Sequence, residues 1–179
     1  MSASHSAVIS TIGRGFDGLD VSALAQDLGA EFIRLEDFDP TVAAVLAEAP
    51  AAENIVAQGT GDISFDAEVA AALGLPLAII SGAPQRTGEL AQHNAESLGA
   101  TVAGIFTDLE AVPGALASLG DVSPVMSADL FQKQLIDQAR AAGAHIVLPE
   151  GDDDRILEAA HVLLRDKVAK LTILGNEAD

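Results

Sequence analysis

The sequence predicts an α/β protein, with a parallel sheet that has helices on both faces, followed by a second α/β unit that is incomplete. Two observations support this prediction. Short apolar runs alternate with segments of helical periodicity along the chain, and 49% of the 179 residues are hydrophobic, which is enough for a substantial core. Because strands that alternate with helices pair in parallel through right-handed crossovers, we expect helices to cover both faces of the sheet.

The first 120 residues contain the elements of one complete domain. Five short apolar runs are typical of strands: residues 7–12, 32–35, 55–57, 77–80 and 102–106. Four segments between them have the spacing of helices: residues 19–28, 41–49, 66–73 and 88–98. Residues 1–120 are therefore expected to form an α/β domain of five strands.

A boundary is expected at residues 121–126. Gly120, Asp121, Ser123 and Pro124 interrupt the periodicity there. The charge balance also changes: the first 126 residues contain 17 acidic and 3 basic residues and no lysine, whereas the rest contain 10 acidic and 6 basic residues. Residues 121–126 are predicted to be a linker, and residues 127–179 a second unit.

The second unit has the pattern of one helix and one βαβ unit. A helix is expected from an N-cap at Ser127 to Gly143. A strand, a helix and a strand then follow at residues 145–148, 156–164 and 171–174. Two parallel strands have unpaired outer edges, and about 50 residues bury little apolar surface. Three explanations are open: the unit extends the first sheet, it pairs in an oligomer, or the chain is a fragment of a longer protein.

Composition excludes several classes of function. The net charge of −18 repels nucleic acid and anionic lipid, and the absence of cysteine excludes disulfides and thiolate metal sites. The four histidines are too scattered for metal-ligand spacing, so no metal site is predicted. Neither a signal sequence nor an apolar run of membrane-spanning length is present, so a cytoplasmic protein is expected.

The loop after the first strand contains three glycines, Gly13, Gly15 and Gly18, with the spacing G-x-G-x-x-G. With Glu36 farther along, this spacing fits a Rossmann dinucleotide site. It also fits the start of a P-loop, but Leu19 and Asp20 stand where that loop needs Lys and Ser or Thr. The domain is therefore predicted to be a degenerate P-loop or Rossmann-like fold without ATP hydrolysis. The glycines serve either retained nucleotide binding or only a tight turn.

The C-terminal unit contains a more specific pattern, in which a strand ends in Pro-Glu-Gly and is followed by Asp-x-Arg-x-Leu-x-Ala-Ala, a helix, and a strand ending in Gly-Asn. The positions are Pro149, Glu150, Gly151, Asp153, Arg155, Leu157, Ala159, Ala160, Gly175 and Asn176. This pattern resembles the start of the phosphate acetyl/butyryltransferase domain. The parts of that domain that perform its chemistry are not in the chain.

A second, looser pattern lies in the first domain. Its positions are Gln58, Gly59, Asp66, Glu68, Ala70, Ala72, Leu73 and Gly74. It resembles the dethiobiotin-synthetase-like domain at the N-terminus of long phosphate acetyltransferases. Those proteins also have a further domain between the two segments, which this chain lacks, so inherited regulation is in doubt.

Together the resemblances imply a phosphate acetyltransferase, which moves acetyl between acetyl phosphate and coenzyme A, with this chain an N-terminal fragment that is inactive alone. They imply a homo-oligomer, coenzyme A as a substrate of the full-length enzyme and no bound cofactor. Two other functions stay open. One is a non-catalytic nucleotide- or metabolite-binding or docking module, and the other is a free-standing dinucleotide-binding protein.

No catalytic residue is assigned. The predicted substrate-binding residues are Glu150, Gly151, Asp154 and Arg155, because they follow the end of a parallel strand, where α/β sheets bind ligands. An arginine fork also suits phosphoryl groups. The alternatives are an acidic helix cap at residues 152–154 and a salt bridge at Arg155. Glu150 and Gly151 either contact the substrate or only position the cleft wall.

Overall fold

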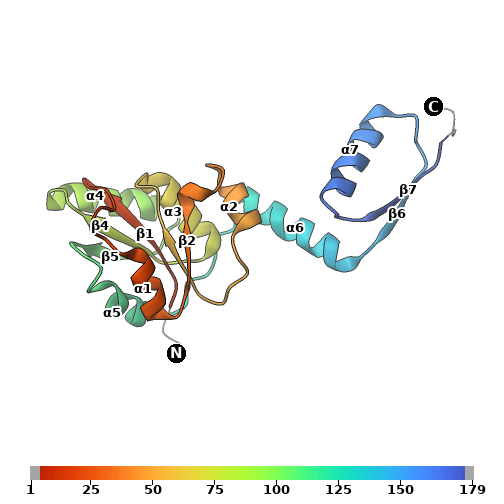
Figure 1. Cartoon of the computed structure of the whole chain (residues 1–179). Coiled ribbons are helices and arrows are strands. Elements are labelled where there is room, and N and C mark those ends of the chain that lie inside the picture. Colours follow the sequence, from red (N-terminus) through yellow and green to blue (C-terminus); the bar gives the residue numbers. More distant parts are fainter. Residues whose placement is uncertain (1–4, 176–179) are drawn as a thin grey trace. The chain divides into compact units, whose positions relative to one another are not determined.

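The structure, a computed structural model, describes residues 5–175 and divides the chain into two compact units, Met1–Leu130 and Phe131–Asp179. The first unit is built on a five-stranded parallel sheet with the order β2-β3-β1-β4-β5. The strands are β1 (Ala7–Ile12), β2 (Glu31–Arg34), β3 (Ile55–Gln58), β4 (Leu77–Ser81) and β5 (Val102–Phe106) (Figure 1). The predicted parallel α/β fold is confirmed.

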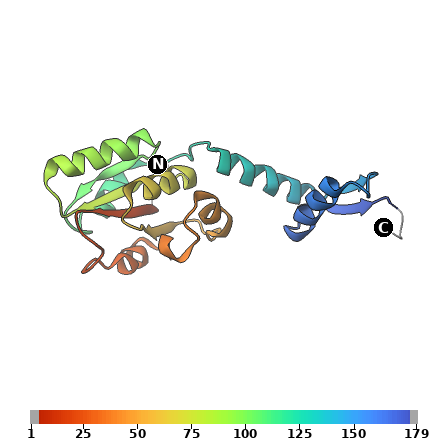
Figure 2. The ribbon, with the colours of Figure 1, turned by 90° about the horizontal axis from the view of Figure 1, so that it is seen from above.

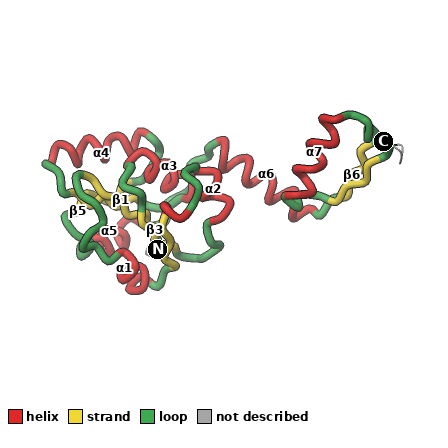
Figure 3. Tube along the Cα trace, turned by 45° about the horizontal axis from the view of Figure 1, so that its top comes forward, coloured by secondary structure: helices red, strands yellow, loops and turns green. Residues whose placement is uncertain are grey.

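Helices cover both faces of this sheet (Figures 1 and 3). The helices are α1 (Val21–Leu28), α2 (Val42–Glu48), α3 (Ile63–Leu73), α4 (Gln85–Ser97) and α5 (Val112–Leu119), with a 3₁₀ turn, η1 (Leu35–Asp37). One hydrophobic cluster unites the sheet with α1 and α5, and another unites it with α2, α3 and α4. On the latter face, α3 and α4 lie side by side (Figure 2).

The centre of the sheet is β1, which is buried on both faces, as parallel sheets are. Side chains alternate between the two faces, so Val8 joins the cluster under α3 while Ala7 and Ile9 join the cluster under α1. All three are fully buried. The apolar run at the start of the chain is therefore the core strand of the first unit.

Several elements of the first unit differ from the predicted ones, and two of them, α5 and α3, differ for a clear local reason. Helix α5 was not predicted, although Val112 and Leu116 are spaced by four residues and both are fully buried. Helix α3 starts at Ile63, three residues before the predicted start, because Asp62 caps it by accepting hydrogen bonds from the Ser64 and Phe65 backbone N–H groups.

A buried carboxylate joins three parts of the first unit. Asp66, on α3, is fully buried. Its Oδ2 accepts hydrogen bonds from the Ser10 hydroxyl of β1 at 2.5 Å and from Gly61 N at 3.2 Å. Its Oδ1 accepts from the backbone N and the hydroxyl of Thr60, both at 2.9 Å. Four donors on two oxygens satisfy a carboxylate that would otherwise be costly to bury.

We expect Asp66→Asn to lower the free energy of unfolding by about 1–3 kcal/mol at neutral pH, because one of the two oxygens becomes an NH₂ group and a buried N–H loses its acceptor. Glu68→Gln removes an exposed carboxylate from the same helix and is expected to change stability by less than about 0.5 kcal/mol. Urea unfolding of both variants checks this. Equal effects would show that the buried hydrogen bonds add nothing specific.

The difference in unfolding free energy between the natural protein and Asp66→Asn is expected to depend on pH. Burial raises the pKa of Asp66, and the hydrogen bonds from Ser10, Thr60 and Gly61 oppose the rise. A carboxyl group with a raised folded-state pKa contributes most below its unfolded pKa of about 3.9, and less as the pH rises through the folded pKa. The stability gap between the natural protein and Asp66→Asn should therefore widen as the pH is lowered, and a gap that narrows would contradict the raised pKa.

The segment predicted as a linker lies against the first unit. The backbone N–H of Val125 donates to the Ala71 carbonyl of α3 at 2.8 Å. A few residues later, the Leu130 side chain is buried with Leu46 and Ala72. The start of the following helix therefore packs on the first unit, and the two compact units divide after Leu130. The domain boundaries at residues 120 and 127 stay a prediction.

The second unit consists of most of α6 (Ala128–Ala142), β6 (His145–Leu148), α7 (Asp154–Arg165) and β7 (Lys170–Ile173). β6 and β7 pair in parallel, and α7 is the connection between them. These two strands form a sheet of their own in the described residues. Ala160 and Val168 are buried, but many large apolar side chains are exposed: Phe131, Leu135, Ile146, Val147, Leu157, Val162, Leu164, Ile173 and Leu174.

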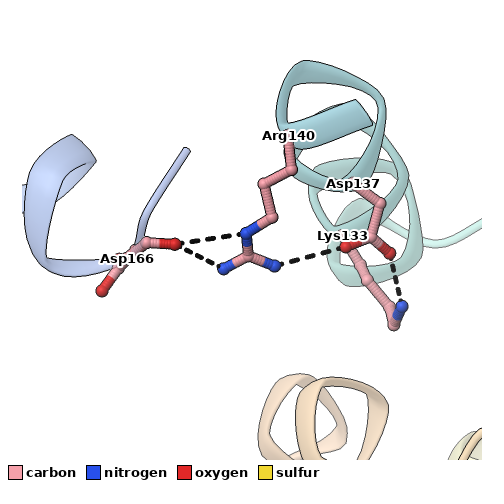
Figure 4. Close-up of polar contacts among 4 residues, drawn as sticks. All are labelled: Lys133, Asp137, Arg140 and Asp166. Atoms are coloured by element: carbon pink, nitrogen blue, oxygen red, sulfur yellow. Dashed lines mark hydrogen bonds and ion pairs between the residues drawn. The ribbon is translucent and has the colours of Figure 1, made fainter. Parts of the chain in front are cut away.

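A chain of polar contacts holds α6 to the end of α7 (Figure 4). Arg140 donates from Nε and Nη2 to the Asp166 carbonyl at 3.2 and 2.8 Å. Its Nη1 also meets Asp137, which accepts from Lys133 at 2.6 Å. These groups are substantially exposed to solvent, so the ion pairs themselves contribute little stability. The fork from Arg140 to the Asp166 carbonyl is the direct link from α6 to the residue that follows α7.

Candidate functional site

The first candidate site lies where the connections of the sheet diverge. From β1 the chain passes through α1 to β2, and from the neighbouring β4 it passes through α4 to β5, on the opposite face and toward the opposite edge. In open α/β sheets, ligands bind in the crevice between two such strands at their carboxyl ends. The loop that contains Gly13, Gly15 and Gly18 follows β1 at this place.

At this place the loops after β1 and β4 touch. Gly13 has a φ of +68°, and a Cβ atom added to it would lie 2.6 Å from the Cβ of Ala83. A Cβ on Gly82 would lie 3.0 Å from that of Arg14. Gly15, by contrast, has nothing within 4 Å of the position of a Cβ. Gly13 thus allows two loops to approach closely, which is the tight-turn role.

The basic side chain of this loop, Arg14, donates its hydrogen bonds to backbone carbonyls. Arg14 donates from Nε to the Gly15 carbonyl at 3.2 Å and from Nη2 to the Asp17 carbonyl at 2.9 Å. Its Nη1 reaches the Thr107 carbonyl, just after β5, at 3.4 Å. The guanidinium therefore ties the loop after β1 to the end of β5. It is not directed at an open phosphate site.

A carboxylate occupies the N-terminus of α1, where a P-loop or Rossmann fold binds phosphate. Asp20 accepts hydrogen bonds from Ala23 N at 2.9 Å and from the Ser22 hydroxyl at 2.7 Å. The Ala23 N–H and then the Ser22 hydroxyl hold the pKa of Asp20 below its usual range. Glu36, the predicted ribose-binding acid, pairs with Arg34 at 3.0 Å. A fixed negative charge at the helix start disfavours a second anion there.

We expect Gly13→Ala to lower the free energy of unfolding by about 1–3 kcal/mol, because the alanine adds a left-handed backbone cost and an overlap with Ala83. Gly15→Ala should change it by less than about 0.5 kcal/mol, since its side chain meets open space. Thermal or urea unfolding of the two variants measures the difference. If the two glycines prove equally sensitive, close packing of the loops is not the reason for the motif.

The second candidate site lies after β6. Glu150, Asp152, Asp153, Asp154 and Arg155 line an open cavity of about 690 Å³. The structure thus brings the predicted residues Glu150, Asp154 and Arg155 to one place.

Gly151 joins the ends of the two strands beside this cavity. Its N–H donates to the Leu174 carbonyl at 3.0 Å, and a Cβ on it would lie 2.7 Å from that oxygen. A glycine is therefore needed where the loop after β6 crosses the end of β7. The predicted position of this segment at the carboxyl edge of a parallel strand pair agrees with the geometry.

Arg155 and Asp153 form a bidentate ion pair at the mouth of this cavity. Nε and Nη2 of Arg155 meet Oδ1 and Oδ2 of Asp153 at 3.1 and 2.7 Å, and Asp153 also accepts from the Arg155 backbone N–H as the cap of α7. The guanidinium lowers the pKa of Asp153, and Asp153 raises the pKa of Arg155. The Arg155 side chain is 88% exposed, so it is accessible to a ligand. Substrate contact by Glu150, Gly151, Asp154 and Arg155 stays a prediction.

Sequence reasoning missed the structural role of Asp66. The sequence did contain an indication of this role, because Asp66 is an acidic residue beside Ala67, Val69 and Ala70 on the core-facing side of a helix. Within the described residues, no group of three or more histidine and acidic side chains is placed to hold a metal ion. None of the described helices is both long and apolar enough to cross a membrane.

Comparison with known proteins agrees with the pattern around the second site. Residues 130–179 match the family model described as phosphate acetyl/butaryl transferase. A phosphate acetyltransferase of Corynebacterium glutamicum is 61% identical over 51 residues, which cover 28% of this chain and 16% of that protein. Those of Synechocystis sp. and Escherichia coli are 51% identical over 47 residues and 39% identical over 64 residues.

The matched segments are short relative to these proteins. They cover 26% and 36% of this chain, but only 7% of the Synechocystis protein and 9% of the Escherichia coli protein. No solved structure matches the chain. The resemblance to phosphate acetyltransferases that the sequence predicted is thereby confirmed for residues 130–179.

Proposed function

We propose that this chain is the N-terminal portion of a phosphate acetyltransferase, which transfers acetyl between acetyl phosphate and coenzyme A. The 61% identity over 51 residues to the Corynebacterium glutamicum enzyme is the observation that supports it most. The position of Glu150, Asp154 and Arg155 around one cavity, beside the joined ends of β6 and β7, supports it further.

The proposed reaction needs three things from an active site. The coenzyme A thiol attacks the acetyl carbon, a base takes the thiol proton, and the bond from that carbon to the phosphate oxygen breaks as phosphate leaves. Donors must stabilise the charge that develops on the departing phosphate. Arg155 is suited to stabilising the departing phosphate, because a guanidinium fork matches phosphate oxygens. The cavity after β6 provides one wall of a cleft, so the chain alone should not turn over acetyl phosphate.

The same proposal leads to expectations about the substrates, the cellular location and the assembly of the enzyme. Small-molecule substrates, a cytoplasmic location and a homo-oligomer are expected, with no nucleic-acid partner because the net charge is −18. The alternative, a nucleotide-binding or docking module as the function of the whole chain, is less well supported. Asp20 and the touching loops after β1 and β4 leave little place for a phosphate.

The first test is the intact mass of the native protein and its turnover of acetyl phosphate and coenzyme A in the same sample. A mass well above 18.2 kDa together with turnover is the expected result. A native protein of 18.2 kDa without turnover would contradict the proposal, and turnover at that mass would show that the chemistry lies within this chain.

The second test compares two arginines of α7 in the native enzyme. Arg155→Gln should lower kcat/KM by about tenfold or more, since a charge-assisted hydrogen bond to phosphate is lost. Arg165→Gln breaks a similar bidentate pair, with Asp166, at the other end of the helix and should change kcat/KM by less than about twofold. Equal effects of the two substitutions would remove Arg155 from the substrate site.

A further inference from the structure

A further cavity in the first unit shares only Glu36 with the candidate sites described above. It has a volume of about 490 Å³ and lies after the carboxyl ends of β2 and β3. Its lining residues are Leu35, Glu36, Phe38, Pro40, Thr60, Asp62 and Phe65. The carboxyl end of a parallel sheet is the edge where α/β proteins bind ligands, and this volume is in the range of small-molecule pockets.

Four of the seven lining residues of this cavity are apolar, and two of these are aromatic. Phe38 and Phe65 pack against the core cluster under α3 and remain partly exposed toward the cavity. The chain has six phenylalanines and no tyrosine or tryptophan, so two of its six aromatic side chains line this one space. Phenylalanine faces favour a planar or apolar ligand, with offset or edge-to-face contact between rings.

Two of the lining side chains, Glu36 and Asp62, are carboxylates. Glu36 uses Oε2 in its pair with Arg34, and Asp62 uses Oδ1 as the cap of α3. Among the described residues, no bond is made by the second oxygen of either carboxylate, so each can accept one from a ligand. The lining contains no basic side chain. An N–H donor or a cation is therefore favoured over a phosphate or carboxylate.

The polar wall of the cavity is fixed from behind. Thr60 donates through both its backbone N–H and its hydroxyl to the buried Asp66, and its hydroxyl accepts from Asp62 N at 3.1 Å. The loop between β3 and α3 is thus held in one conformation before a ligand arrives. A preorganised wall reduces the entropy cost of binding.

We propose that this cavity binds a planar aromatic cation or amine, with its ring between Phe38 and Phe65 and its N–H groups on Glu36 and Asp62. The site is separate from the acetyl transfer proposed above and does not depend on it. Its ligand is opposite in charge to acetyl phosphate and coenzyme A, so binding of those substrates gives no account of this cavity.

The test is a titration of the full chain with two probes of similar size and opposite charge, benzamidine and benzoate, followed by the backbone amide NMR signals. We expect saturable binding of benzamidine, with the largest shifts at residues 35–40 and 60–65, and binding of benzoate weaker by about tenfold. Absence of saturable benzamidine binding, benzoate binding of equal strength, or shifts confined to other residues would overturn the proposal.

Matched variants separate this site from general attraction to an acidic protein. Glu36→Gln should weaken benzamidine binding by about threefold, because one exposed ion pair is lost. Glu48→Gln removes the same charge from the end of α2, outside the cavity lining, and should leave the affinity unchanged. If both variants weaken binding equally, the probe responds only to the net charge and the proposed site is wrong.

Discussion

The buried carboxylate of Asp66 is the interaction on which the first unit depends. It joins α3 to the hydroxyl of Ser10 on the central strand and to the backbone of Thr60 and Gly61 after β3. A carboxylate without these donors would be costly to bury, so the two strands, the loop and the helix must take their places together. These hydrogen bonds restrain the loop after β3, and Thr60 in the wall of the aromatic cavity is part of this network.

At the same edge, groups that bind phosphate in a P-loop make contacts within the chain. At the point of divergence between β1 and β4, a ligand crevice is replaced by contact between Gly13 and Ala83. Arg14 donates to loop carbonyls, and Asp20 takes the amide of Ala23 at the helix start. The Arg14 guanidinium and the Ala23 amide are thus both engaged within the chain itself. The motif G-x-G-x-x-G therefore serves the close approach of two loops at Gly13, and its phosphate-binding role is not supported by these contacts.

Local patterns predicted most of the fold. The runs at 7–12 and 77–80 coincide with strands because most of their residues are apolar, which is typical of a parallel strand buried on both faces. Helix α5 was not predicted because eight residues with two buried positions form too short a pattern to show helical periodicity. The contact of Gly13 with Ala83 and the hydrogen bond from Ser10 to Asp66 were not predictable, since they join residues that are far apart in the sequence. The ion pair of Arg155 was among the alternatives because its partner is two residues away.

The first unit has a complete core, whereas the second has a parallel strand pair whose partners are not supplied by the described residues. Hydrogen exchange of the backbone amides in the chain by itself tests this directly. We expect strong protection of β1, β3 and β4, with the amides of β6 and β7 exchanging much faster. Equal protection of both units would contradict it, because the strand pair would then be stable without further partners.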